Sequence, residues 1–223
     1  MMQPRNIEMQ AYLNLINSDS VVYDIGAHIG ETCKIFEKHS PKKIYAFEPN
    51  ELNFNELKEN TKNISNLEYF KLALSDDSFS CNTRFRDCRV DGDESNPEQY
   101  IEYDTIDSVI KKYSLLQPSF VKMDIEGMES KVLTTFDTIF KNSRPFIYVE
   151  IHAQERGSTN DNYEKCPHWA WPEDGGFDFN LLKDLNYKVF SEKDNLLDIN
   201  ENWNPSENDH MGYILTPKEK VSY

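Results

Sequence analysis

The sequence lacks any long apolar run and has fewer basic than acidic residues. No stretch approaches the roughly 20 consecutive apolar residues that a membrane-spanning helix needs. The start, Met1 to Arg5, shows no charged segment followed by an apolar core, so we expect no signal peptide. With 24 basic and 39 acidic residues, the net charge is −15. This charge repels phosphate backbones and anionic membranes, so we expect neither nucleic acid nor a membrane as a partner.

Cysteines are also scarce, and their spacing does not match a zinc site. The four are Cys33, Cys81, Cys88 and Cys166. We expect them to be reduced thiols in a cytoplasmic protein. The sequence shows no internal repeat, and 223 residues fit a single α/β domain spanning residues 1–223.

Strands and helices are predicted to alternate through the first half of the chain. A leading helix over residues 1–19 precedes this series. We expect strands at 21–25, 44–47 and 67–72, with helices at 31–39 and 50–60 between them. Strand–helix alternation of this kind favours parallel pairing with right-handed crossovers.

The second half is predicted to contain two variable loops, at residues 75–103 and 153–176. The first contains a hairpin, 80–85 with 100–103, around a mobile loop. We expect the remaining elements to be helices at 105–113 and 177–185, strands at 145–151, 187–190 and 211–215, and a strand that contains Phe120 and Val121 and ends at Asp124. One helix is expected after Asp124, with Met128, Val132, Phe136 and Ile139 on its apolar face.

A glycine turn follows the first predicted strand. Gly26 and Gly30 lie in the run Asp24 to Gly30, and glycines there allow close approach of a ligand. Glu48 ends the second strand, where an acid bonds the ribose hydroxyls of an adenosine cofactor. The spacing is G-x-x-x-G, and His28 stands where a dinucleotide fingerprint has its second glycine. Because Asp24 would repel a pyrophosphate, the cationic S-adenosylmethionine fits better. The alternative is a turn that only joins strand to helix.

Three further titratable residues end the fourth and fifth strands. Asp124 ends the fourth strand, and Glu150 and His152 end the fifth. Glu150 and His152 are two residues apart, so they lie on the same side of the chain. They are candidates to take a proton from an acceptor hydroxyl or to hold a metal such as Mg²⁺, although a lone imidazole is unusual for that ion. Alternatively, Asp124 caps a helix, Glu150 forms a salt bridge and His152 is a loop residue.

Trp169 and Trp171 lie in the predicted insertion at 153–176. Aromatic faces can stack on a sugar ring, so this pair is a candidate for substrate binding. The alternative is a loop that packs on itself.

Four segments together resemble FkbM-type S-adenosylmethionine-dependent methyltransferases: 24–30, Phe47-Glu48-Pro49, Thr105-Ile106-Asp107, and the Lys-x-Asp-x-Glu-Gly-x-Glu run of residues 122–129. The resemblance implies the Rossmann-like class I methyltransferase fold, a mostly parallel seven-stranded sheet with helices on both faces and one antiparallel strand near its edge. It also implies methyl transfer to oxygen, often on sugars.

The resemblance also implies roles for particular residues. Cofactor contacts would lie at Asp24, Gly26 and Glu48 and in the turn that contains Ala73 and Leu74, with His28 and Gly30 completing the glycine turn. A metal would be held by Asp124 and Glu150. We therefore expect an O-methyltransferase acting on a sugar hydroxyl of a glycan or small molecule. The alternatives are a nicotinamide-dependent oxidoreductase and a methyltransferase-like binding module without catalysis.

Overall fold

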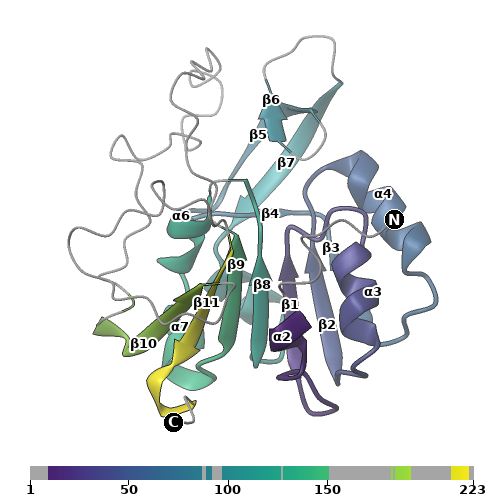
Figure 1. Ribbon diagram of the computed structural model, residues 1–223. Coiled ribbons are helices and arrows are strands. Elements are labelled where there is room, and N and C mark those ends of the chain that lie inside the picture. The colour runs from purple at the N-terminus through teal and green to yellow at the C-terminus, as the bar shows by residue number, and fades with distance from the viewer. Residues whose placement is uncertain are drawn as a thin grey trace.

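A computed structural model describes residues 10–86, 89–91, 97–126, 128–150, 182, 184–191 and 212–220. Its main feature is a seven-stranded sheet with the order β3-β2-β1-β8-β9-β11-β10 (Figure 1). The strands are β1 Val21–Ile25, β2 Lys43–Phe47, β3 Leu67–Phe70, β8 Phe120–Met123, β9 Phe146–Glu150, β10 Tyr187–Ser191 and β11 Gly212–Pro217. Among the described strands of this sheet, β11 runs antiparallel to both of its neighbours, β9 and β10, and all other neighbouring strands pair in parallel. The predicted mostly parallel sheet with an antiparallel strand near its edge is confirmed.

Helices cover both faces of this sheet, as the sequence predicts. One buried cluster joins strand residues to α2 Gln10–Leu13, α3 Glu31–Glu37 and α4 Glu51–Asn60. The other joins the opposite face to α5 Ile106–Tyr113, α6 Glu129–Leu133 and α7 Asp137–Asn142. Successive strand residues alternate between the two clusters: Val21, Tyr23 and Ile25 belong to the second and Val22 to the first. Strand periodicity of two therefore decides which face each polar residue occupies.

Two predicted helices differ from the observed ones. The leading helix ends at Leu13 instead of continuing to residue 19. The helix expected after Asp124 is two short helices, α6 and α7. The hydroxyls of Thr134 and Thr135 donate to the carbonyls of Lys131 and Val132, at 2.7 and 2.8 Å. These carbonyls lie at the end of α6, where a helix has no further N–H donors of its own. Apolar residues recur at helical spacing across the break between α6 and α7, which is why the sequence pattern predicted a single helix.

A second sheet replaces most of the loop predicted at 75–103. Its order is β4-β7-β5-β6, from β4 Ala73–Leu74, β5 Phe79–Arg86, β6 Arg89–Asp91 and β7 Glu98–Asp104. The predicted hairpin is present as β5 and β7, which pair from Phe79–Tyr103 to Arg84–Glu98. Phe85, Ile101 and Tyr103 are its buried core, and the Phe79 ring stacks on Tyr103 at 4.4 Å. This small sheet projects beyond the end of the main sheet (Figure 1).

Two other expectations are affected by the structure. Cys33 is a free, buried thiol, as predicted. Cys81 is disulfide-bonded, so the expectation of reduced thiols throughout is wrong. The insertion at 153–176 lies outside the described residues. None of the helices that the structure describes has the length and apolar character needed to cross a membrane.

Candidate active site

The glycine turn after β1 packs directly against the end of β8. Gly26 and Gly30 have φ of +78° and +88°, a conformation that glycine adopts with little strain. The N–H groups of Gly26 and Ala27 both donate to the carbonyl of Phe47, at 3.0 Å. A Cβ at Gly26 would lie 1.9 Å from the carbonyl oxygen of Asp124. Only glycine therefore allows the turn after β1 to lie this close to the end of β8.

Glu48 lies beside this turn, immediately after β2. Its carboxylate is buried and accepts hydrogen bonds from the N–H groups of His28 and Asn50, each at 2.9 Å. Burial raises the pKa of Glu48 to about 7, although the two backbone donors oppose this shift. His28 contributes its backbone at φ +49°. The structure thus brings two predicted cofactor residues, His28 and Glu48, into direct contact.

Asp24 is completely buried on the face covered by α3. One carboxylate oxygen accepts hydrogen bonds from the Thr32 hydroxyl, at 2.5 Å, and from the Cys33 thiol, at 3.1 Å. The other oxygen accepts no hydrogen bond from the described residues. It lies 3.7 Å from the Lys122 ammonium. In this structure the predicted cofactor acid therefore points beneath the glycine turn.

Lys122 is a functional candidate that the sequence reasoning missed. It is the cross-strand partner of Asp24 in the β1–β8 pairing, and its side chain is about 5% exposed. The ammonium donates to the Gly26 carbonyl at 2.7 Å and lies 3.7 Å from carboxylate oxygens of both Asp24 and Asp124. Burial alone would lower the pKa of Lys122, but the charges of Asp124, Asp24 and Glu150 outweigh burial and raise it. Its signal was present in the Lys-x-Asp run, where only the acids were considered.

Asp124 and Glu150 end adjacent strands at the same level. Met123 pairs with Val149, so the residues that follow them lie side by side. The Asp124 side chain is 28% exposed, and Glu150 accepts a hydrogen bond from the Tyr148 hydroxyl at 3.2 Å. The predicted convergence of these two acids is thus reproduced. In the turn that follows β8, Glu129 accepts a hydrogen bond from the Ile125 N–H at 3.0 Å.

The described residues do not fit the predicted Mg²⁺ site. No group of three His, Cys, Asp or Glu side chains that could hold a metal occurs among them. The Lys122 ammonium lies 3.7 Å from Asp124 and would repel a divalent cation placed on the Asp124 and Glu150 carboxylates. Metal binding by these two acids is therefore not supported.

The other predicted site residues have mixed outcomes. Ala73 and Leu74 form β4, which pairs with Tyr103 and Asp104 of β7, so they are a short strand and not an open turn. Leu74 is buried in the main core. His152, Trp169 and Trp171 lie outside the described residues.

Comparison with known proteins shows to which family this fold and this glycine turn belong. The sequence model of the methyltransferase FkbM domain matches residues 24–189. This chain belongs to the FkbM methyltransferase domain family. The match begins at Asp24 and includes the glycine turn, Glu48, Lys122, Asp124 and Glu150. The resemblance seen in the sequence motifs is confirmed.

Individual relatives of this FkbM domain are distant. The hexuronic acid methyltransferase AglP of Haloferax volcanii is 28% identical over 139 residues, which cover 60% of this chain and 57% of that protein. The chain thus matches under two thirds of that relative's length. The crystal structure of an FkbM methyltransferase from Methylobacillus flagellatus superposes with a TM-score of 0.52 at 15% identity, over 90% of this chain and 44% of that one. A rRNA methylase structure from Streptococcus thermophilus gives 0.51 at 10% identity, over 96% of each chain. These two structures show the class I methyltransferase fold.

Proposed function

We propose that this FkbM domain is an S-adenosylmethionine-dependent O-methyltransferase whose acceptor is a sugar hydroxyl in a glycan or a glycosylated metabolite. One observation carries the proposal. Asp24 is the second-to-last residue of β1, and Glu48 and Asp124 directly follow β2 and β8, so the three acids lie near the same edge of the sheet, around the Gly26 turn. In open α/β sheets, ligands bind at the carboxyl ends of the strands.

In this proposal the cofactor lies across the glycine turn. Glu48 accepts hydrogen bonds from the ribose hydroxyls, as an acid at the end of the second strand does in adenosine-binding folds. Asp24 supplies negative charge beneath the turn for the cationic cofactor. The remaining cofactor residues of the proposal are Gly26, His28, Gly30, Ala73 and Leu74.

The bound cofactor would supply an electrophilic methyl group, and its sulfur would keep the electron pair of the broken bond. The residues of the chain then have two tasks. They hold the acceptor oxygen in line with the methyl group, which is the main source of rate in such a reaction. They also accept the hydroxyl proton, for which the partly exposed Asp124 is our first candidate and His152 our second. Glu150, beside Asp124, is assigned to orient the acceptor through a hydrogen bond.

The sugar acceptor is supported by the relative AglP, which methylates a hexuronic acid according to its name. We also assign Trp169 and Trp171 to stacking on the acceptor ring.

The test compares binding with turnover. We expect the wild-type chain to bind S-adenosylmethionine in isothermal titration calorimetry and to transfer a labelled methyl group to a member of a panel of uronic acids and neutral glycans. Asp124→Asn should keep the cofactor affinity within about twofold and reduce turnover by about 10²-fold or more, since general-base catalysis contributes roughly this much.

The matched control is Asp137→Asn. Asp137 is an exposed acid of α7 that pairs only weakly with Lys141, at 3.8 Å, so its variant should retain full turnover. A wild-type chain that binds NADH but not S-adenosylmethionine would overturn the proposal. Cofactor binding without turnover on any glycan would instead favour a binding module.

A further inference from the structure

We propose that Lys122 is a positioning residue that serves as a built-in cation, holding the cofactor turn against Asp124. This inference rests on the proposed function. The inference goes beyond the proposed function, because Lys122 is neither one of the site residues assigned there nor one of the predicted metal ligands.

The contacts of Lys122 join segments that are far apart in the sequence. Its ammonium donates to the Gly26 carbonyl, 96 residues away, at 2.7 Å. It also lies 3.7 Å from Asp24, the second-to-last residue of β1, and 3.7 Å from Asp124, which follows β8. One charged group therefore fixes the glycine turn relative to both acids.

Packing in the core does not explain a lysine at position 122. Lys122 shares a sheet face with the apolar Phe120 and Tyr148, and only about 5% of its side chain is exposed. Taking an ammonium out of water carries a large free-energy cost, and ion pairing often only offsets that cost. An apolar residue at this position would stabilise the core as well. The lysine is better explained by what its charge does at the cofactor turn.

The Lys122 ammonium does not balance the charges of the Asp24 and Asp124 carboxylates. Two carboxylates and one ammonium leave a formal charge of −1 under the turn, and the proposed cofactor would carry a positively charged sulfonium. The arrangement of a backbone carbonyl and two carboxylates is also one that a hard cation would occupy. Lys122 takes that place with a charge of only +1. It thus holds the acids together and still leaves negative charge to attract the cofactor.

The test measures the affinities for S-adenosylmethionine and for S-adenosylhomocysteine separately, by calorimetry on the full chain. The first compound carries the sulfonium charge and the second a neutral thioether. Lys122→Met keeps the side-chain length and removes its charge, so the local charge becomes −2. Both compounds should bind more weakly, because the Gly26 turn loses its tether. The preference for the sulfonium over the thioether should increase roughly fivefold, as expected for one added charge at several ångströms.

Two further variants separate positioning from folding. Lys43→Met removes a lysine of β2 whose partner is the exposed Glu68, and it should change neither affinity nor preference. Lys122→Met combined with Asp24→Asn restores the charge of −1. This double variant should return the preference to the wild-type value while both affinities remain weak, and it tests the idea even where the single variant does not fold.

The outcomes distinguish this inference from the proposed function. A wild-type chain that binds neither compound overturns the proposed function. If the wild type binds both and Lys122→Met leaves the preference unchanged, Lys122 is only structural and this inference fails. It also fails if the double variant binds both compounds as tightly as the wild type does.

Discussion

Glu48 combines two opposing influences on its carboxyl group. The side chain is 6% exposed, which penalises the charged form, while the N–H groups of His28 and Asn50 favour it. Burial is the larger influence and raises the pKa from 4.5 to about 7. At neutral pH the group that we assign to the cofactor ribose is therefore close to half ionised before any ligand binds.

This shift predicts a pH dependence of stability. Between pH 4.5 and about 7 the folded state binds a proton at Glu48 that the unfolded state has released. The contribution of Glu48 to the free energy of unfolding is therefore complete below pH 4.5 and is lost as the pH rises through 7. A shift from 4.5 to about 7 corresponds to a loss of about 3 kcal/mol.

The measurement is urea unfolding of the wild type and of Glu48→Gln between pH 5 and 8. The difference in free energy of unfolding between them should decrease with rising pH, because the glutamine does not titrate. A difference that stays constant over this interval would show that the Glu48 pKa is close to its ordinary value.

Single residues of the site were predictable to different degrees. Gly26, Glu48 and Asp124 could be found because each follows an apolar run at a strand end, and strand ends of a parallel sheet converge. Lys122 was missed although it belongs to the Lys-x-Asp run, because the sequence places it inside a strand and its role depends on a cross-strand pairing with Asp24. The burial of the Asp24 side chain was equally hidden, because it follows from packing of α3.

Strands of the main sheet were predicted within one or two residues of their observed ends, from β1 to β9. Their apolar runs are short and sharply bounded, so local pattern and final burial agree. The small sheet was harder to predict. Residues 75–103 are rich in charge, and their pairing depends on a core of only three buried side chains, Phe85, Ile101 and Tyr103. The break between α6 and α7 was missed because the apolar period continues through it.

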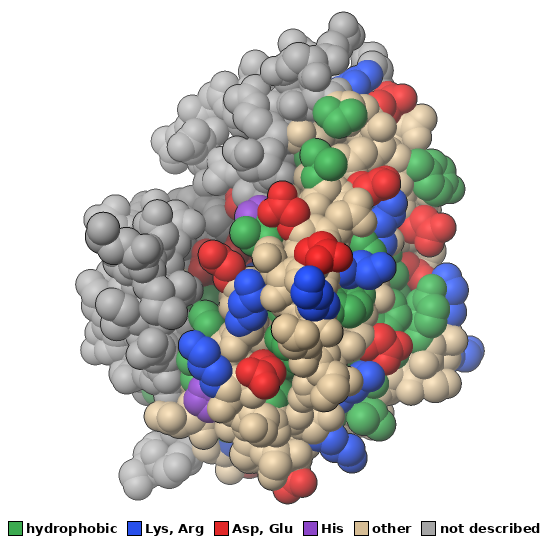
Figure 2. Space-filling model, turned by 90° about the vertical axis from the view of Figure 1, so that its right-hand side faces the viewer, with side chains coloured by type: hydrophobic (Ala, Val, Ile, Leu, Met, Phe, Trp, Pro, Cys, Tyr) green, Lys and Arg blue, Asp and Glu red, His purple; other side chains and the backbone are tan. Residues whose placement is uncertain are grey.

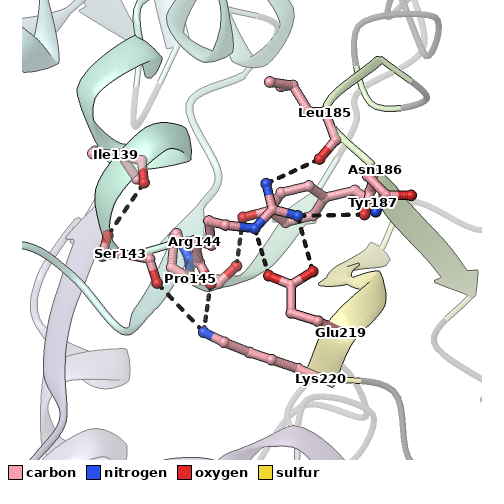
Figure 3. Close-up of polar contacts among 9 residues, drawn as sticks. All are labelled: Ile139, Ser143, Arg144, Pro145, Leu185, Asn186, Tyr187, Glu219 and Lys220. Carbon is pink, nitrogen blue, oxygen red and sulfur yellow. Dashed lines mark hydrogen bonds and ion pairs between the residues drawn. The ribbon is translucent and has the colours of Figure 1, made fainter.

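Arg144 joins α7, β10 and the short helix η3 Lys218–Lys220 that follows β11. Its guanidinium binds both carboxylate oxygens of Glu219 at 2.5 and 3.1 Å, donates to the Leu185 carbonyl at 3.0 Å, and lies over the Tyr187 ring (Figure 3). Lys220 reaches back to the carbonyls of Ser143 and Arg144. These contacts fasten the last strand pair to the start of β9.

Removing this connection should destabilise the domain without affecting its site. Arg144→Ala loses several hydrogen bonds and a partly exposed ion pair, which together predict a loss of about 1–2 kcal/mol in the free energy of unfolding. The site should be unaffected, because Arg144 precedes β9 and Glu150 ends it. Urea unfolding and calorimetric cofactor affinity measure the two effects.

Glu219→Gln provides the matched control for Arg144→Ala. It keeps an acceptor oxygen for the guanidinium and removes only the charge, so it should lose about 0.5 kcal/mol or less. An Arg144→Ala variant that unfolds like the wild type, or that loses cofactor affinity while remaining folded, would contradict the proposed role of this cluster.

The fold of the domain does not by itself decide which substrate it binds. Proteins with this fold and only 10% identity to this chain include one described as a rRNA methylase, so fold alone does not distinguish the substrate classes. Charge distinguishes the possibilities. The chain carries a net charge of −15, and on the face in Figure 2 the described acidic and basic side chains are interspersed without a continuous basic patch. RNA binding generally requires several basic contacts to phosphates.

We therefore predict that the protein does not bind RNA at 0.15 M salt. Fluorescence anisotropy of a labelled rRNA hairpin should show a Kd weaker than about 10⁻⁴ M, the weak limit of ordinary non-specific binding. Lowering the salt to 0.02 M should not rescue binding, because the net charge of −15 repels the phosphates more strongly when they are less screened. In parallel, labelled S-adenosylmethionine should methylate a sugar acceptor and leave rRNA unlabelled. Tight RNA binding that weakens as the salt concentration rises would contradict this prediction and show that basic residues of the chain form a nucleic-acid site.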